Sequence, residues 1–320
     1  KIFKKNFNYK DEFINYVQPK IIVSSIDNDI GIYKIKQKHK DKKIIVIQNG
    51  WRDSTDIFQH LKVYNNTNEL SADHILTFTE IVSQEYRKYI QSNYLAIGSV
   101  KSNEIELKTN YNSNTISYIS QWGSKAFCEN SVCRTILVFL KKYALKNNKN
   151  LKIILRNNFN DRLLDQEIDY FSSILGYRIK EGKDFEKLNQ YISCDNSEIV
   201  VGADSTLCYE SLGRGNKTAI FSIRDEVLKQ NGFYKYGLSK KDYGYPGGFS
   251  FGWPSSFEDI GFFWTNKLNE DIFTNILDDL FSVDIDDWKQ LLLEHNISEL
   301  MPYDFENLKF KQFFIDNLQL

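Results

Sequence analysis

The sequence predicts an α/β protein built from two doubly wound domains, each with a parallel sheet covered by helices on both faces. Short runs rich in Ile, Val and Leu alternate with amphipathic stretches through most of the 320 residues. Continuous apolar strands flanked by helices are typical of a parallel sheet that is buried on both faces. The alternation occurs twice, on either side of a polar stretch at residues 108–114 that lacks an apolar period. That stretch is therefore the expected linker between two domains.

The first domain is expected over residues 1–110, with strands at 20–24, 43–48, 74–77 and 94–97. The second is expected over 114–300, with a helix at 132–146 and strands at 115–120, 151–155, 177–179, 199–201 and 217–221. A further amphipathic helix is expected at 303–320, after Pro302. Open α/β sheets bind ligands at the carboxyl ends of their strands, so polar residues that follow a strand are the candidates for a site.

The charge, the apolar runs and the cysteine content of the chain exclude several classes of protein. Lys and Arg number 41 against 42 Asp and Glu, a formal charge of −1, so no general positive field attracts nucleic acid. A Lys-rich run at 34–43 is either a solvated surface or a patch that touches an anionic acceptor or an anionic membrane, such as the inner membrane face. No apolar run approaches the ~20 residues that cross a bilayer. With four cysteines and no CxxC pair, reduced thiols and a cytoplasmic location are expected.

The most informative stretch is 197–221, which reads as a strand, a small polar turn, a helix, a Gly stop and a second strand. Asp204, Ser205 and Thr206 stand where the free N–H groups and the dipole of a helix favour an anion. Glu210 follows one turn later, placed to reach a ribose or sugar hydroxyl. An ordinary helix cap would explain Asp204 or Ser205 alone, but the whole combination favours a nucleotide-donor site.

Three further residues that could bind the nucleotide donor come directly after neighbouring strands of the second domain. Ser120 and Gln121 come directly after 115–119, and Arg156 follows 151–155. All three are expected at the edge of the sheet where the nucleotide would lie. Arg156 would meet a phosphate, with a surface ion pair as the alternative.

The first domain offers a second set of polar residues. Asn49, Arg52 and Asp53 follow the strand at 43–47, and Asp27 and Asn28 follow that at 20–24. Asn28, Asn49 and Arg52 are expected on the acceptor side of the cleft, since a guanidinium pairs bidentately with a phosphate or an acidic sugar. Asp27 and Asp53 are the candidate catalytic carboxylates, as general base or as nucleophile. The alternative is a purely structural role: a turn at Asn49, and a turn or a helix cap at Asp27 and Asn28.

Two further expectations concern a loop and metals. The Gly- and aromatic-rich segment at 243–254 is either a lid over the sugar or a packed aromatic loop. No Asp-X-Asp stands at a strand end with a convincing second acidic partner, so no metal is predicted.

These motifs carry a family resemblance. The segment 201–215 resembles the nucleotide-binding segment of GT-B glycosyltransferases, in which a Ser/Thr-rich turn precedes a helix that carries Glu. The whole chain resembles bacterial surface-carbohydrate biosynthesis proteins related to the retaining β-Kdo transferases of lipopolysaccharide and capsule assembly. The residues that carry this wider resemblance lie at 26–28, 47–52, 78–80, 97–103, 119–121, 201–215, 261–266 and 303–307.

The resemblance implies two Rossmann-like domains facing a cleft, in the GT-B architecture. It also implies transfer of a sugar, with CMP-Kdo as the first choice of donor, to an oligosaccharide or glycolipid acceptor without a metal cofactor. Three alternatives remain open on the same fold: a CDP-glycerol-type phosphotransferase, a nucleotide-sugar epimerase and a non-catalytic carbohydrate-binding module.

Overall fold

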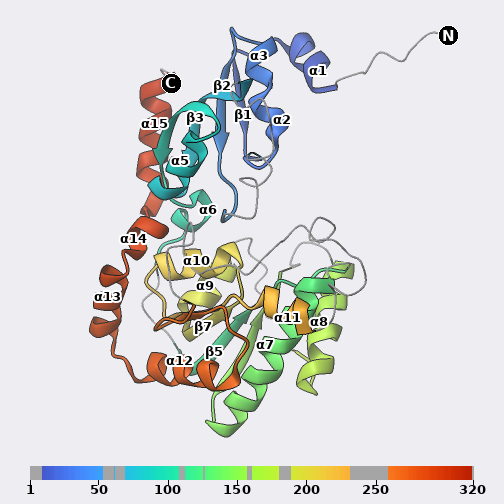
Figure 1. Cartoon of the computed structure of the whole chain (residues 1–320), viewed down its shortest axis with the longest axis vertical. Coiled ribbons are helices and arrows are strands. Elements are labelled where there is room, and N and C mark those ends of the chain that lie inside the picture. The colour runs from blue at the N-terminus through green and yellow to red at the C-terminus, as the bar shows by residue number, and fades with distance from the viewer. Residues whose placement is uncertain are drawn as a thin grey trace, which may run out of the picture.

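The computed structural model describes residues 9–52, 61, 69–107, 112–124, 127–156, 161–179, 189–230 and 259–318. Its strands form two separate parallel sheets (Figure 1). The first has the order β1-β2-β3-β4 and comprises Ile21–Ser24, Lys43–Ile47, Ser71–Thr77 and Gln91–Ala96. The second has the order β6-β5-β7-β8-β9 and comprises, in chain order, Asn112–Ile119, Asn150–Ile154, Ser197–Gly202, Thr218–Phe221 and Trp264–Thr265. The predicted α/β class is confirmed.

We call the first sheet with its helices the first unit. Its strand β2 shows why the sheet is parallel: Ile44, Ile45 and Val46 are all fully buried, so both faces of the sheet are covered. The helices of this unit are α1 (Tyr9–Val17), α2 (Ile30–Tyr33), α3 (Ile35–Lys38), α5 (Glu80–Arg87) and α6 (Val100–Asn103).

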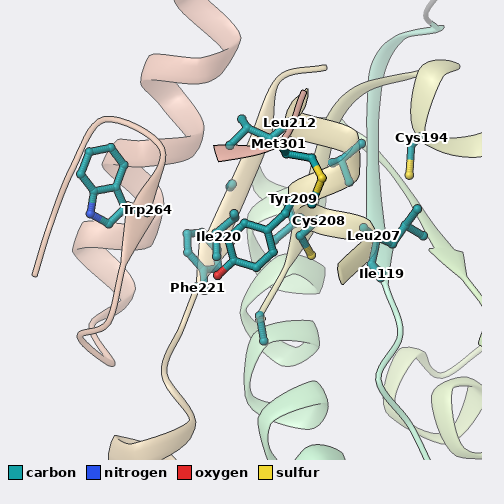
Figure 2. Close-up of a cluster of buried hydrophobic side chains, with 14 of the residues drawn as sticks. Ile119, Cys194, Leu207, Cys208, Tyr209, Leu212, Ile220, Phe221, Trp264 and Met301 are labelled. Carbon is teal, nitrogen blue, oxygen red and sulfur yellow. The ribbon is translucent and has the colours of Figure 1, made fainter. Parts of the chain in front are cut away.

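The second sheet and its helices form the second unit. Its helices are α7 (Phe127–Lys146), α8 (Asp161–Leu175), α9 (Asn189–Asp195), α10 (Thr206–Gly213), α11 (Arg224–Gln230), α12 (Glu270–Ser282), α13 (Ile285–Glu294) and α14 (Ile297–Leu300). Figure 2 shows the apolar side chains of α10 in the buried cluster that also contains Ile220 and Phe221 of β8. Gly202 permits this close packing, because a Cβ there would lie 2.1 Å from the Cys208 sulfur.

The C-terminal end of the chain returns to the first unit (Figure 1). A short 3-10 turn, Phe305–Asn307, leads into α15 (Leu308–Leu318), whose Phe313 packs with Ile45, Leu76 and Ile97. The returning segment passes close to Gly98, which has a φ of +73° and whose added Cβ would lie 2.4 Å from the Pro302 carbonyl oxygen. Both the backbone conformation and the contact therefore require glycine there.

Arg214 joins the two units where α10 ends. Its guanidinium group has no exposed surface and pairs with Asp195, donating from Nε at 3.0 Å and also from Nη2. The same group donates to the carbonyl oxygens of Ser102 at 3.0 Å and Ile105 at 2.9 Å, which belong to the segment that leaves the first unit. One buried cation therefore neutralises Asp195 and satisfies the connecting backbone.

The structure lacks one predicted strand and contains one strand that was not predicted. The strand expected at 177–179 is absent, because Gly176, at a φ of +80°, ends α8 and the Ile179 N–H bonds back to Ser172 Oγ. The two-residue strand β9 was not predicted, since it is too short to show a period. In the described part of the chain, no helix combines the length and apolar character needed to span a membrane.

Candidate functional site

A cavity of about 450 Å³ lies where strand ends of the two sheets face each other. From the first unit, Asn28 follows β1, and Trp51 and Arg52 follow β2. The second unit contributes residues that follow β5, β6, β7 and β8. Among the described residues, the cavity is lined by Asn28, Trp51, Arg52, Ile119, Ser120, Gln121, Ile154, Arg156, Gln190, Asp204, Ser205, Thr206, Leu207 and Arg224.

Eight of the predicted site residues line this cavity together. They are Asn28, Arg52, Ser120, Gln121, Arg156, Asp204, Ser205 and Thr206. Asp53 and the segment 243–254 lie outside the described residues, so their roles stay predictions. The other three predicted residues do not line the cavity, although each is close in sequence to a residue that does. They are Asp27, Asn49 and Glu210.

Asp27 lies beneath the cavity and does not open onto it. Its carboxylate is fully buried and accepts bonds from Arg52 Nε at 2.8 Å and Arg52 Nη2 at 2.6 Å. Tyr86 donates its hydroxyl to the same carboxylate at 2.8 Å, and the Asn49 N–H donates at 3.1 Å. Burial and the neighbouring Asp27 charge raise the pKa of Tyr86 well above its ordinary value, so the phenol stays a proton donor. This network fixes the Arg52 guanidinium at the cavity wall.

A second ion pair stands across the cavity. Arg224 donates to Asp204 from Nε at 3.0 Å and from Nη2 at 2.8 Å, and Gln121 Nε2 donates to the same carboxylate at 2.6 Å. Arg224 was missed by the sequence analysis, although it comes shortly after the predicted strand at 217–221. Arg156 donates only weakly, at 3.4 Å, to the Gln121 carbonyl oxygen, and its side chain is exposed.

The amino end of α10 opens onto the same cavity. Ser205 is the N-cap, in an extended conformation, but its side chain makes no capping hydrogen bond. Thr206 Oγ1 accepts a bond at 2.9 Å from the backbone N–H of Trp51 in the first unit. The Trp51 ring stacks on Tyr209 of α10, with centroids 3.8 Å apart and planes 5° apart. The loop after β2 therefore rests on the beginning of the predicted donor helix.

Glu210 does not face the cavity in this structure. Its carboxylate is buried and accepts a hydrogen bond from Ser99 Oγ of the first unit, with the Tyr191 hydroxyl as a further neighbour. Burial raises the pKa of Glu210 above its ordinary value, and the hydrogen bonds from Ser99 and Tyr191 oppose that shift. The predicted contact of Glu210 with ribose stays a prediction, and the observed contact joins the two units.

Neither thiols nor a metal centre contribute to the described site. Cys133, Cys194 and Cys208 are free and buried. Burial raises the pKa of the Cys133 thiol to about 11, so this thiol is protonated near neutral pH. Within the described ranges, no three His, Cys, Asp or Glu side chains are grouped so as to hold a metal ion.

Comparison with known proteins assigns the chain to a protein family. Residues 45–318 match a family described as "putative O-antigen biosynthesis protein". No curated protein matches the chain. A Listeria monocytogenes structure described as a "putative UDP-N-acetylglucosamine 2-epimerase" is similar, at 10% identity and a TM-score of 0.55, over 98% of this chain and 78% of that one.

Two further structures have the same fold. The Neisseria meningitidis UDP-GlcNAc 2-epimerase bound to UDP-GlcNAc is 10% identical, with a TM-score of 0.52, over 96% of this chain and 78% of that one. A glycosyltransferase from Rickettsia africae is 11% identical, with a TM-score of 0.50, over 100% of this chain and 84% of that one. At these identities the similarity establishes the fold alone. The chain therefore belongs to this O-antigen biosynthesis family and has a glycosyltransferase-like fold of the GT-B type.

Proposed function

We propose that the chain is a glycosyltransferase that moves a sugar from a nucleotide-activated donor to a surface-polysaccharide acceptor. The observation that carries the proposal is the composition of the cavity, which joins the free N-cap of α10 and Arg156 to Asn28 and Arg52 of the other unit. Structures with this fold include one in complex with UDP and one bound to UDP-GlcNAc. The acceptor in this proposal is an oligosaccharide or a glycolipid.

The charges of the lining suit an anionic donor. Arg52 and Arg224 are each neutralised by an aspartate, whereas Arg156 forms no ion pair with any described residue. The donor phosphate would meet Arg156 together with the N–H groups at the start of α10, beside Ser205. Positive charge fixed around the departing phosphate stabilises the transition state electrostatically. No metal is part of this proposal.

The roles of the carboxylates follow from their contacts. We assign Asp27 to the positioning of Arg52, because its buried carboxylate is bound to that guanidinium, to the Tyr86 hydroxyl and to the Asn49 N–H, and is not among the described residues that line the cavity. Asp204 is the one carboxylate among the described lining residues, and it is bound to Arg224. Asp53 is therefore the remaining candidate for a carboxylate that acts on the acceptor or the sugar, and the stereochemical outcome depends on that choice.

The alternative functions require different chemical groups in the cavity. An epimerase needs acid and base groups at the sugar carbon, and the described lining offers only the paired Asp204 and no histidine. A CDP-glycerol-type phosphotransferase would use the same phosphate contacts, and a carbohydrate-binding module would not require them. CMP-Kdo remains our first choice of donor, solely on the resemblance of the whole chain to proteins related to the β-Kdo transferases.

A thermal-shift titration with CMP, CDP, UDP and GDP tests the proposal. One nucleotide is expected to stabilise the wild type, by roughly 2.7 kcal/mol at a hundred times its Kd. Ser205→Ala with Thr206→Ala is expected to abolish that shift. The matched control, Thr274→Ala with Ser282→Ala, removes two hydroxyls of α12 that are not part of the described lining and is expected to keep the shift. Stabilisation by CMP supports Kdo transfer, CDP favours the phosphotransferase, UDP favours a hexose donor or an epimerase, and no shift with any nucleotide refutes the proposal.

A further inference from the structure

A buried carboxylate of α8 contacts two residues that line the cavity. Glu167 is 0% exposed, and its Oε1 accepts hydrogen bonds from the Ser120 hydroxyl and, at 2.9 Å, from the Arg156 N–H. Ser120 follows β5, Arg156 follows β6, and both belong to the cavity lining. Glu167 itself is not among the described residues that line the cavity. One oxygen atom behind the cavity wall therefore joins two strand ends that form the wall.

Glu167 stands on the apolar face of its helix. Leu164 and Phe171, three residues before it and four residues after it, are both buried, as is Ile168. An apolar side chain would suit that face, because a buried carboxylate is costly unless hydrogen-bond donors surround it. The packing of α8 therefore does not require Glu167, whereas the N–H and O–H groups at the two strand ends do need an acceptor.

Side chains of two helices hold the backbone of Arg156. The ladder between β5 and β6 extends to the Ile154 carbonyl oxygen, which accepts at 3.0 Å from the first residue after β5. Beyond it, the Leu155 carbonyl oxygen accepts from Gln190 Nε2 of α9 at 2.6 Å. The next group along the chain, the Arg156 N–H, donates to Glu167 of α8. Both groups belong to one peptide plane, so this plane is fixed where the exposed Arg156 side chain begins.

The bond to Glu167 also decides what Ser120 can offer a ligand. The carboxyl oxygen that accepts the Arg156 N–H is an unprotonated one, so the Ser120 hydroxyl donates to it. Ser120 Oγ accepts in turn from the Trp122 N–H at 3.1 Å. A hydroxyl has one proton and two lone pairs, so one lone pair is left. Ser120 is therefore suited to accept a hydrogen bond from a hydroxyl or amino group, and it has no proton for a phosphate oxygen.

We propose that Glu167 is a positioning residue for the nucleotide; this inference rests on the function proposed above. Through Ser120, Glu167 presents a hydrogen-bond acceptor to a hydroxyl or amino group of the nucleoside. Through the fixed peptide plane, it places the Arg156 guanidinium at the phosphate. One buried carboxylate would then set the positions of two contacts that bind different parts of the nucleotide.

Calorimetric titration of the full chain with CMP, CDP, UDP and GDP tests the proposal. Glu167→Leu suits the apolar face of α8 but removes the acceptor of both bonds, and it is expected to raise the Kd of the bound nucleotide at least about tenfold. Glu167→Gln keeps a carbonyl oxygen that accepts both bonds and is expected to stay within about twofold of the wild type. Ser120→Ala is expected to raise the Kd about fivefold in the wild type, and less in the Glu167→Leu background, because the two residues act together.

Ile174→Ala is the matched control, because it deletes buried apolar atoms of the same helix outside the described cavity lining. It is expected to lower stability but to bind as the wild type does. A Glu167→Leu variant that binds within about twofold of the wild type, a Glu167→Gln variant that loses as much affinity as Glu167→Leu should, or a control that does so would overturn this inference and leave the proposed function intact.

A second variant covers the case in which Glu167→Leu does not fold. Glu167→Asp, whose side chain is one methylene shorter, should raise the Kd at least about threefold, and unchanged binding would overturn the inference. A wild type that binds none of these nucleotides would refute the proposed function itself, and this inference with it.

Discussion

Replacing Asp27 with asparagine separates a positioning role from a catalytic one. The change keeps the shape of the side chain but removes the negative charge opposite Arg52. One carboxylate oxygen accepts from Arg52 Nη2 and the Asn49 N–H, and the other accepts from Arg52 Nε and the Tyr86 hydroxyl. Asparagine keeps one acceptor oxygen, but its NH₂ group cannot accept a hydrogen bond, so two of the four donors would lose their acceptor.

The magnitude follows from the burial of the pair. The Asp27 side chain is 0% exposed and that of Arg52 is 6% exposed, so solvent screens their interaction little. Breaking a buried ion pair by removing one partner costs about 3–5 kcal/mol. We therefore expect Asp27→Asn to lose about that much unfolding free energy in urea. Glu80→Gln, which breaks the exposed pair with Arg87, is the control and should lose at most about 1 kcal/mol.

Turnover of the nucleotide donor decides between the two roles. A positioning role predicts that Asp27→Asn loses stability and weakens nucleotide binding together, since Arg52 is released from the cavity wall. If Asp27→Asn instead unfolds within about 1 kcal/mol of the wild type while donor turnover collapses, our assignment is wrong and Asp27 takes part in the reaction.

Three further predictions follow from contacts between the two units. Arg214→Met leaves Asp195 buried without its cation and should cost about 3–5 kcal/mol in urea unfolding; a loss under about 1 kcal/mol would contradict the role of Arg214 at the junction. Burial raises the pKa of Glu210 above its ordinary 4.5, so the folded protein retains a proton that the unfolded chain releases, and stability falls as the pH rises above 4.5. Glu210→Gln should therefore gain stability relative to the wild type as the pH is raised from 4.5 to neutral, and a pH-independent difference would argue against the shift. Trp51→Ala removes the stack on Tyr209 and should raise the nucleotide Kd by roughly tenfold in calorimetry, whereas Tyr209→Phe, which keeps the stack, should bind normally.

The sequence was most informative where local pattern decides the structure. The run Ile44 to Ile47 is apolar on both faces, and such a strand has one stable place, inside a parallel sheet. Because parallel strands end at one edge, the residues after each strand could be assigned to a common site without knowing the strand order. That reasoning led to Ser120, Arg156 and Ser205.

The remaining features depend on contacts between distant segments. Asp27 and Asn28 are neighbours in sequence, yet one is buried under Arg52 and the other lines the cavity, because the partner of Asp27 lies 25 residues away. The burial of Glu210 likewise depends on Ser99, which belongs to the other unit. Local pattern carries no information about how two units meet.

The return of α15 to the first unit has a consequence for synthesis on the ribosome. The first sheet is translated before the second, but Ile45, Leu76 and Ile97 gain their packing partner Phe313 only after both sheets have been made. The second sheet has all its strands by residue 265. Of the two sheets, the one that is made first is therefore completed last, and until then one of its apolar faces remains open to chaperones.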